Sequence, residues 1–236
     1  MTARPKIIAV AGNIGAGKSS LVDWLSKQLG MVPFFEPHDE NPYLADFYQD
    51  MHRWAFSSQL FFLIKRFQIH RQIAEQSSER HDSTPRGTGP LPAANVALVQ
   101  DRTLYEDAEI FARHLHRQGY IDDRDFQTYQ DLYHTLRKEL RPPDLMIYLR
   151  CPLRTLVKRI ARRGRDFEKA IPRAYLKQLE VLYEEWFQEY NLSPTLVVET
   201  DRIDYIEHLF DRLELVRAVK EHIGPVAAGG RERDPT

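Results

Sequence analysis

The feature that most constrains this 236-residue chain is a glycine-rich segment near its start, Gly12-Asn13-Ile14-Gly15-Ala16-Gly17-Lys18-Ser19. It matches the pattern G-x-x-x-x-G-K-S/T, in which glycines let the backbone curl so that several N–H groups point at phosphate oxygens. In this pattern the lysine reaches the β- and γ-phosphates, and the hydroxyl that follows it ligates Mg²⁺. The pattern predicts a buried strand over residues 7–11 and a helix from about Ser20, whose positive dipole end favours anions. We therefore expect residues 12–20 to bind the phosphates of a nucleotide.

Further short apolar segments predict four more strands, over residues 32–35, 96–100, 145–149 and 196–199. Each is followed by polar residues, and helical patterns separate them, as in a doubly wound sheet. We predict a three-layer α/β fold in which a five-stranded parallel sheet is flanked by helices. In such sheets, ligands bind beyond the carboxyl ends of the strands.

Composition and length predict a single domain over residues 1–223, followed by a disordered tail over residues 224–236. Residues 77–95 are rich in proline, glycine and polar residues, which indicates an exposed loop, either a partner site or an unconstrained insertion. The formal net charge of −1 argues against nonspecific nucleic-acid binding and favours a small-molecule substrate. The single cysteine excludes an intramolecular disulfide, and the nine histidines suggest no metal site. No run of about 18 apolar residues suggests a membrane span, so we expect a cytoplasmic protein.

Charged residues follow two of the predicted strands and should meet the phosphate-binding segment in one crevice. Glu36 follows the second strand, where a carboxylate can accept a proton from a substrate hydroxyl or simply face solvent. Asp101 and Arg102 follow the third strand. They suit Mg²⁺ and a charged oxygen respectively, or a helix cap with a surface ion pair.

A basic stretch over residues 154–168 contains five arginines and one glycine, Gly164, which we expect to end a helix. Arg159 and Arg163 are four residues apart and share a helix face. With Arg165 they suit a mobile lid over ATP at about residues 159–170, because guanidinium groups stabilise charge on transferring phosphoryl oxygens. A solvated basic helix face is the alternative.

An aromatic-rich helix predicted over residues 52–76 carries Gln59 and Arg66 on one face. Buried polar groups need partners, and an amide can pair with a nucleobase edge. On the next predicted helix, Asp107 and Phe111 also share a face, so that Asp107 can meet Arg66 while Phe111 stacks on a base. The alternative is an internal ion pair and a core phenylalanine.

Taken in order, these residues resemble the deoxyribonucleoside kinase family over about residues 6–210, and most closely its bacterial deoxyadenosine and deoxyguanosine kinases. The matching phrases are Glu36-Pro37, Asn41-Pro42-Tyr43-Leu44, Arg53-Trp54-Ala55-Phe56, Asp101-Arg102-Thr103-Leu104-Tyr105-Glu106-Asp107 and Arg163-Gly164-Arg165. The resemblance implies a P-loop kinase fold with an arginine-rich lid, ATP and Mg²⁺ as cofactors, and a homodimer.

The resemblance also implies a role for each matching residue. Glu36 is then the general base for the 5′-hydroxyl, and Arg102 holds both that hydroxyl and the Glu36 carboxylate. Asp101 and Ser19 serve Mg²⁺, directly or through water. The remaining implied roles are Tyr48 and Glu168 on the sugar 3′-hydroxyl, Gln59, Phe111, Arg66 and Asp107 on the nucleobase, Lys18, Arg159, Arg163 and Arg165 on the phosphates, and Thr200 and Asp201 around the ATP adenine.

The implied reaction is ATP-dependent 5′-phosphorylation of a deoxyribonucleoside in nucleotide salvage. Arg66 with Asp107 resembles the purine- and cytosine-accepting members, which favours deoxyadenosine or deoxyguanosine and leaves deoxycytidine open. Gln59 can turn its amide to suit either purine. The alternatives are a nucleoside monophosphate kinase on the same fold and a nucleotide-binding regulator without catalysis.

Overall fold

The computed structural model describes residues 4–36, 40–78, 97–201 and 209–224. Five parallel strands form one sheet in the order β2-β3-β1-β4-β5. The strands are β1 (Ile7–Gly12), β2 (Val32–Phe34), β3 (Leu98–Asp101), β4 (Leu145–Arg150) and β5 (Thr195–Glu199). The predicted parallel α/β sheet is therefore confirmed, with strand ends shifted by one or two residues.

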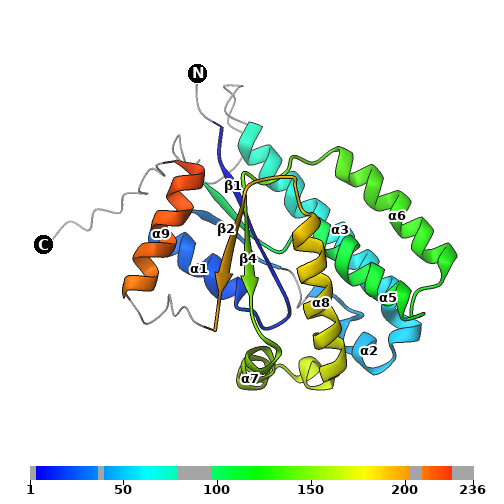
Figure 1. Ribbon diagram of the computed structural model, residues 1–236. Coiled ribbons are helices and arrows are strands. Elements are labelled where there is room, and N and C mark those ends of the chain that lie inside the picture. The colour runs from blue at the N-terminus through cyan, green and yellow to red at the C-terminus, as the bar shows by residue number, and fades with distance from the viewer. Residues whose placement is uncertain (1–3, 37–39, 79–96, 202–208, 225–236) are drawn as a thin grey trace, which may run out of the picture.

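Helices cover both faces of the sheet (Figure 1). One face carries α1 (Lys18–Leu29) and α9 (Leu209–Ile223), which pack on Ile8, Val10 and Ile147. The other face carries a larger group of helices over Ala9, Ala11 and Met146. Its members are α2 (Leu44–Gln49), α3 (Met51–Ser78), α4 (Leu104–Glu106), the π-helix η2 (Asp107–Ala112), α5 (Arg113–Arg117), α6 (Asp123–Lys138) and α8 (Arg173–Glu189). Successive residues of β1 thus feed two different cores, as the alternation of side chains in a strand requires.

The remaining elements lie beyond the carboxyl end of the sheet. Helix α7 (Leu153–Arg163) ends at Gly164, which has φ 72° and confirms the expected helix stop. The short 3₁₀ helix η3 (Asp166–Ala170) follows it. Together they cover the crevice above the phosphate-binding residues.

Two predictions about loops concern segments that the structure describes only in part. Helix α3 continues to Ser78. The predicted start of the loop, at residue 77, is therefore two residues too early. Residues 79–96 and 225–236, including most of the expected tail, lie outside the described residues. Within the described ranges, no helix is long and apolar enough to cross a bilayer.

Candidate active site

Residues 12–19, the phosphate loop, join β1 to α1 and are fixed by their surroundings. Gly15 has φ 82°, and a Cβ there would lie 2.9 Å from Cγ1 of Ile160 in α7, so only glycine fits. The Asn13 side chain donates from Nδ2 to the Leu176 carbonyl of α8 at 3.0 Å. The loop is therefore held between two helices that follow it by more than a hundred residues.

Lys18 folds back over this loop. Its Nζ donates to the carbonyl oxygens of Gly12 at 2.9 Å and Asn13 at 3.1 Å. Burial, and then the nearby Arg102 cation, lower the pKa of Lys18 to about 8. A bound phosphate anion would favour the charged ammonium and raise this pKa.

Ser19 and Asp101 meet across the crevice. The Ser19 hydroxyl donates to Oδ2 of Asp101 at 2.5 Å. The other carboxylate oxygen, Oδ1, is buried and has no hydrogen-bond partner within the part of the chain that the structure describes. An oxygen-only pair with an unsatisfied carboxylate oxygen fits the ligand preference of Mg²⁺.

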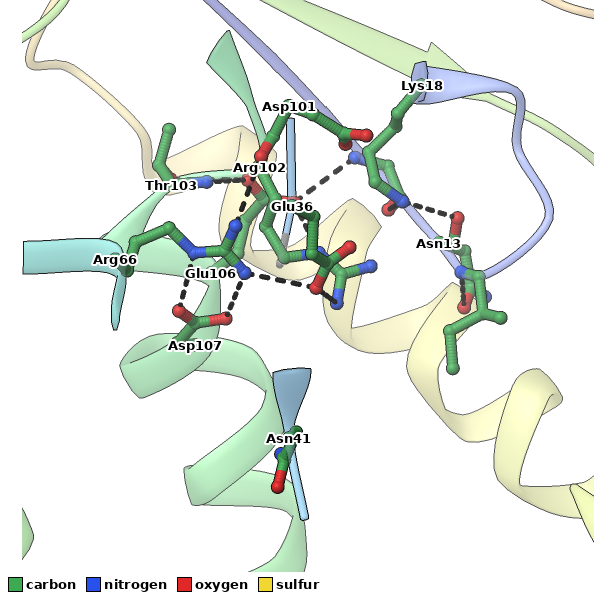
Figure 2. Close-up of polar contacts among 12 residues, drawn as sticks. Asn13, Lys18, Glu36, Asn41, Arg66, Asp101, Arg102, Thr103, Glu106 and Asp107 are labelled. Atoms are coloured by element: carbon green, nitrogen blue, oxygen red, sulfur yellow. Dashed lines mark hydrogen bonds and ion pairs between the residues drawn. The ribbon is translucent and has the colours of Figure 1, made fainter. Parts of the chain in front are cut away.

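Glu36 lies beyond the end of β2, between two arginines (Figure 2). Its Oε1 accepts from Nη2 of Arg66 at 3.0 Å and lies 3.4 Å from Nη1 of Arg102. Burial raises the pKa of Glu36, but the Arg102 and Arg66 cations outweigh burial and hold the pKa below its usual range. The carboxylate is therefore ionised at neutral pH.

Arg66 uses its whole guanidinium inside the protein. It donates from Nε and Nη2 to the two carboxylate oxygens of Asp107, at 2.9 and 3.3 Å, and from Nη1 to the Asp101 carbonyl at 3.1 Å (Figure 2). The expected contact between Arg66 and Asp107 is thus present. The Arg66 side chain is only 1% exposed and does not line the central cavity of the site, which is described below. Asp107 does line that cavity.

One cavity gathers most of the predicted site residues. Those that line it are Ile14, Gly15, Gly17, Lys18, Ser19, Ser20, Glu36, Tyr48, Gln59, Arg102, Asp107, Phe111, Arg163, Arg165 and Glu168. Apolar residues that sequence reasoning did not select complete its walls, namely Leu44, Phe47, Phe62, Phe167 and Tyr175. Residues of the glycine-rich loop, carboxylates and aromatic side chains therefore converge on one cavity.

The predicted lid arginines contact a carboxylate in this state. Arg163 donates from Nε to Oε2 of Glu168 at 2.9 Å, and Nη1 of Arg165 lies 3.5 Å from Oε1. Tyr48 lines the same end of the cavity, and burial together with Glu168 raises its pKa above the ordinary value. Tyr48 is therefore a neutral hydroxyl beside a paired carboxylate.

Arg159, which we expected to act with Arg163 in the lid, does not line this cavity. It donates from Nη1 to the Ala16 carbonyl at 2.9 Å and from Nη2 to the Thr200 carbonyl at 2.7 Å. It thereby ties the phosphate loop to the end of β5. Asp201 follows Thr200, and its Oδ2 lies 3.6 Å from Nη2 of Arg154.

Glu106 is a buried residue of this site to which sequence analysis assigned no role. It accepts from the backbone N–H groups of Gly12 at 3.3 Å and Thr103 at 2.8 Å, and from the Tyr183 hydroxyl at 2.9 Å. The available sequence pattern was Thr103-x-x-Glu106, a capping box, which forms here at the start of α4. Such a box predicts the local contact with Thr103, but not the contact with the phosphate loop.

Sequence comparisons match this chain to known proteins over most of its length. The family model described as deoxynucleoside kinase matches residues 8–224. The chain is 34% identical over 218 residues to the deoxyadenosine/deoxycytidine kinase of Bacillus subtilis strain 168, covering 89% of this chain and 92% of the relative. It is also 34% identical to a deoxyguanosine kinase of Lactobacillus acidophilus, over 87% of this chain and 86% of the relative.

A solved structure is similar along nearly its whole length. The deoxyadenosine kinase from M. mycoides with bound dCTP superposes with a TM-score of 0.71 at 30% identity. The match covers 91% of this chain and 98% of that one.

Proposed function

The chain belongs to the deoxynucleoside kinase family, and on that premise we propose that it transfers the γ-phosphoryl group of ATP to the 5′-hydroxyl of a deoxypurine nucleoside. As a member of this family it is an enzyme that phosphorylates deoxynucleosides. The observation that carries the finer proposal is the position of Glu36, ionised between two arginines in the cavity that also contains Lys18. The residue that activates the acceptor and the residue that binds the donor thus line the same cavity.

Glu36 orients the acceptor and takes up its proton. The 5′-hydroxyl donates a hydrogen bond to the carboxylate, and its oxygen attacks the γ-phosphorus as the bond to the β-phosphate oxygen breaks. Because the two arginines lower the pKa of Glu36, the carboxylate is a weak base and need not remove the proton before transfer. That order suits a loose transition state, in which positioning and electrostatics do most of the work.

The phosphate loop and Lys18 bind the donor phosphates, and Ser19 with Asp101 would hold Mg²⁺. The metal would supply positive charge that offsets the charge of the donor phosphates. Arg163 and Arg165 act on the transferring group once they leave Glu168, which then accepts from the sugar 3′-hydroxyl alongside Tyr48. Exchange of partners by Glu168 thus couples substrate binding to lid closure.

The nucleobase lies among the apolar walls, stacked on Phe111 and paired with Gln59, and Arg66 acts on it through Asp107. Gln59 is only 4% exposed, which supports a pairing with a buried base edge. The names of the relatives include both purine kinases and a deoxyadenosine/deoxycytidine kinase, so deoxycytidine is a second acceptor to test. Thr200 and Asp201 border the ATP adenine, and Arg159 joins this segment to the phosphate loop.

A nucleoside monophosphate kinase is a weaker alternative. It would need cations around an acceptor phosphate. The proposed acceptor end of the cavity is instead lined by three carboxylates, those of Glu36, Asp107 and Glu168. A regulator without catalysis would have no need for an ionised carboxylate in the donor cavity. We further propose that the enzyme is cytoplasmic and works as a homodimer. Light scattering of the purified chain would test the dimer.

The test is ATP-dependent phosphorylation of the four natural deoxynucleosides side by side with Mg²⁺, with dAMP as a further acceptor. We expect 5′-monophosphate from deoxyadenosine or deoxyguanosine. Turnover of thymidine alone would contradict the assignment of Arg66 and Asp107. Turnover of dAMP alone would contradict the acceptor site.

A further inference from the structure

Glu106 is a fully buried carboxylate that the mechanism above does not use. It is 0% exposed and lies at the end of α4, between the phosphate loop, the turn at Arg102 and α8. Its Oε1 accepts from the Gly12 N–H and the Tyr183 hydroxyl, and its Oε2 accepts from the N–H and hydroxyl of Thr103. Every one of these partners donates to it.

The backbone partners make this geometry specific to a carboxylate. A backbone N–H can only donate, and one such group faces each oxygen of Glu106. A glutamine of the same shape would turn its NH₂ group toward one of them and leave a buried donor without an acceptor. The structure therefore requires acceptors at both positions.

The partners of Glu106 belong to the two halves of the reaction. Gly12 begins the phosphate loop, and its carbonyl accepts from Lys18. Thr103 follows Arg102, whose φ of 64° is a left-handed conformation that is unfavourable for a non-glycine residue. Glu106 fixes the backbone on the far side of that strained residue.

The carboxyl group of Glu106 also faces the side chain of Arg102. Oε1 lies 3.9 Å from Nε of Arg102, and this buried N–H has no hydrogen-bond partner among the described residues. The same guanidinium reaches Glu36 with Nη1. Arg102 thus lies between the carboxylate that faces the acceptor and the carboxylate that anchors the donor loop.

We propose that Glu106 is a positioning residue for phosphoryl transfer, which sets the donor-phosphate loop at a fixed distance from the Arg102 guanidinium that holds the acceptor. The proposal rests on the proposed function. Glu106 touches no substrate and acts through Gly12 and Arg102. Its loss should therefore slow the chemical step more than it weakens either substrate.

The experiment compares Glu106→Gln with Asp144→Asn, a matched control because both carboxylates accept from backbone N–H groups of β1. Asp144 accepts from the Ile7 N–H at the start of β1 at 2.9 Å, just as Glu106 accepts from Gly12 at its end. We expect Glu106→Gln to lower kcat at least about ten-fold while both KM values change less than about three-fold. Asp144→Asn should lower the Tm and leave kcat within about two-fold.

A double-mutant cycle separates positioning from simple stabilisation. In an Arg102→Lys background, Glu106→Gln should lower kcat less than about two-fold further, because it acts through the same group. Independent effects that multiply would overturn the proposal, as would a Glu106→Gln enzyme with unchanged kcat. If the unmodified chain phosphorylates no deoxynucleoside, the proposed function fails instead.

Tyr183→Phe keeps the test available should Glu106→Gln not fold. It removes one donor to Oε1 and leaves the charge and both backbone contacts in place. We expect kcat to fall about three-fold with both KM values unchanged. An unchanged kcat, or a rise in KM alone, would contradict the positioning role.

Discussion

Arg66 donates from Nη2 to Oε1 of Glu36 at 3.0 Å, so a buried cation from α3 holds the carboxylate that lies beyond β2. Two carboxylates, those of Glu36 and Asp107, share the one guanidinium. The proposed acceptor site is thus part of the ion-pair network that holds α3 against η2.

Arg66→Met tests this network through stability. Removing the buried cation leaves Asp107 without its partner, so we expect the free energy of unfolding to fall by about 3–5 kcal/mol. Arg71→Met is the control on the same helix, since the Arg71–Glu75 pair is exposed and its loss should cost less than about 1 kcal/mol. Equal losses in urea unfolding would contradict the account.

Lys18 gives a pH-dependent prediction. Its pKa is lowered to about 8 in the free protein, and the phosphates of ATP should raise it again, because they favour the charged ammonium. At pH 8, binding should therefore take up about half a proton, and the uptake should vanish as the pH falls well below 8. Calorimetry in buffers of different ionisation enthalpy measures it.

Lys18→Arg is the matched variant for this measurement. The guanidinium stays charged at pH 8 with and without ATP, so proton uptake from this position should disappear. Uptake that persists unchanged in Lys18→Arg would assign the titration to another group.

Asp101→Asn tests the proposed metal site. Loss of the carboxylate charge beside Ser19 should raise the Mg²⁺ concentration needed for half-maximal activity by at least about ten-fold. Asp23→Asn on the exposed side of α1, where Asp23 pairs with Lys27, should leave that concentration unchanged. The same Mg²⁺ dependence in both variants would remove Asp101 from the metal site.

The sheet and the site's location could be predicted because both depend on local patterns. Short apolar segments followed by polar residues marked all five strands, and the carboxyl ends of parallel strands meet at one edge. The contact between Arg66 and Asp107 was expected from α-helical spacing. It forms even though Asp107 begins a π-helix, which spacing alone does not indicate.

Long-range partners could not be predicted in the same way. The direction of the Arg159 side chain depends on two backbone carbonyl oxygens, those of Ala16 and Thr200. These residues lie far from Arg159 in sequence, and a backbone acceptor leaves no mark in the pattern of side chains. Glu106 shows the same limit, because its local capping box is visible but its contact with Gly12 arises only when the strands pair. Sequence patterns identify such charged residues without identifying the backbone groups that they satisfy.

The most direct test of the account is turnover by Glu36→Gln alongside its affinity for ATP. The variant keeps the size of the side chain and removes the charge that accepts the hydroxyl proton. We expect kcat for the preferred deoxynucleoside to fall at least about a hundred-fold, while the Kd for ATP changes less than about three-fold. Turnover within a few-fold of the unmodified enzyme would show that Glu36 does not activate the acceptor.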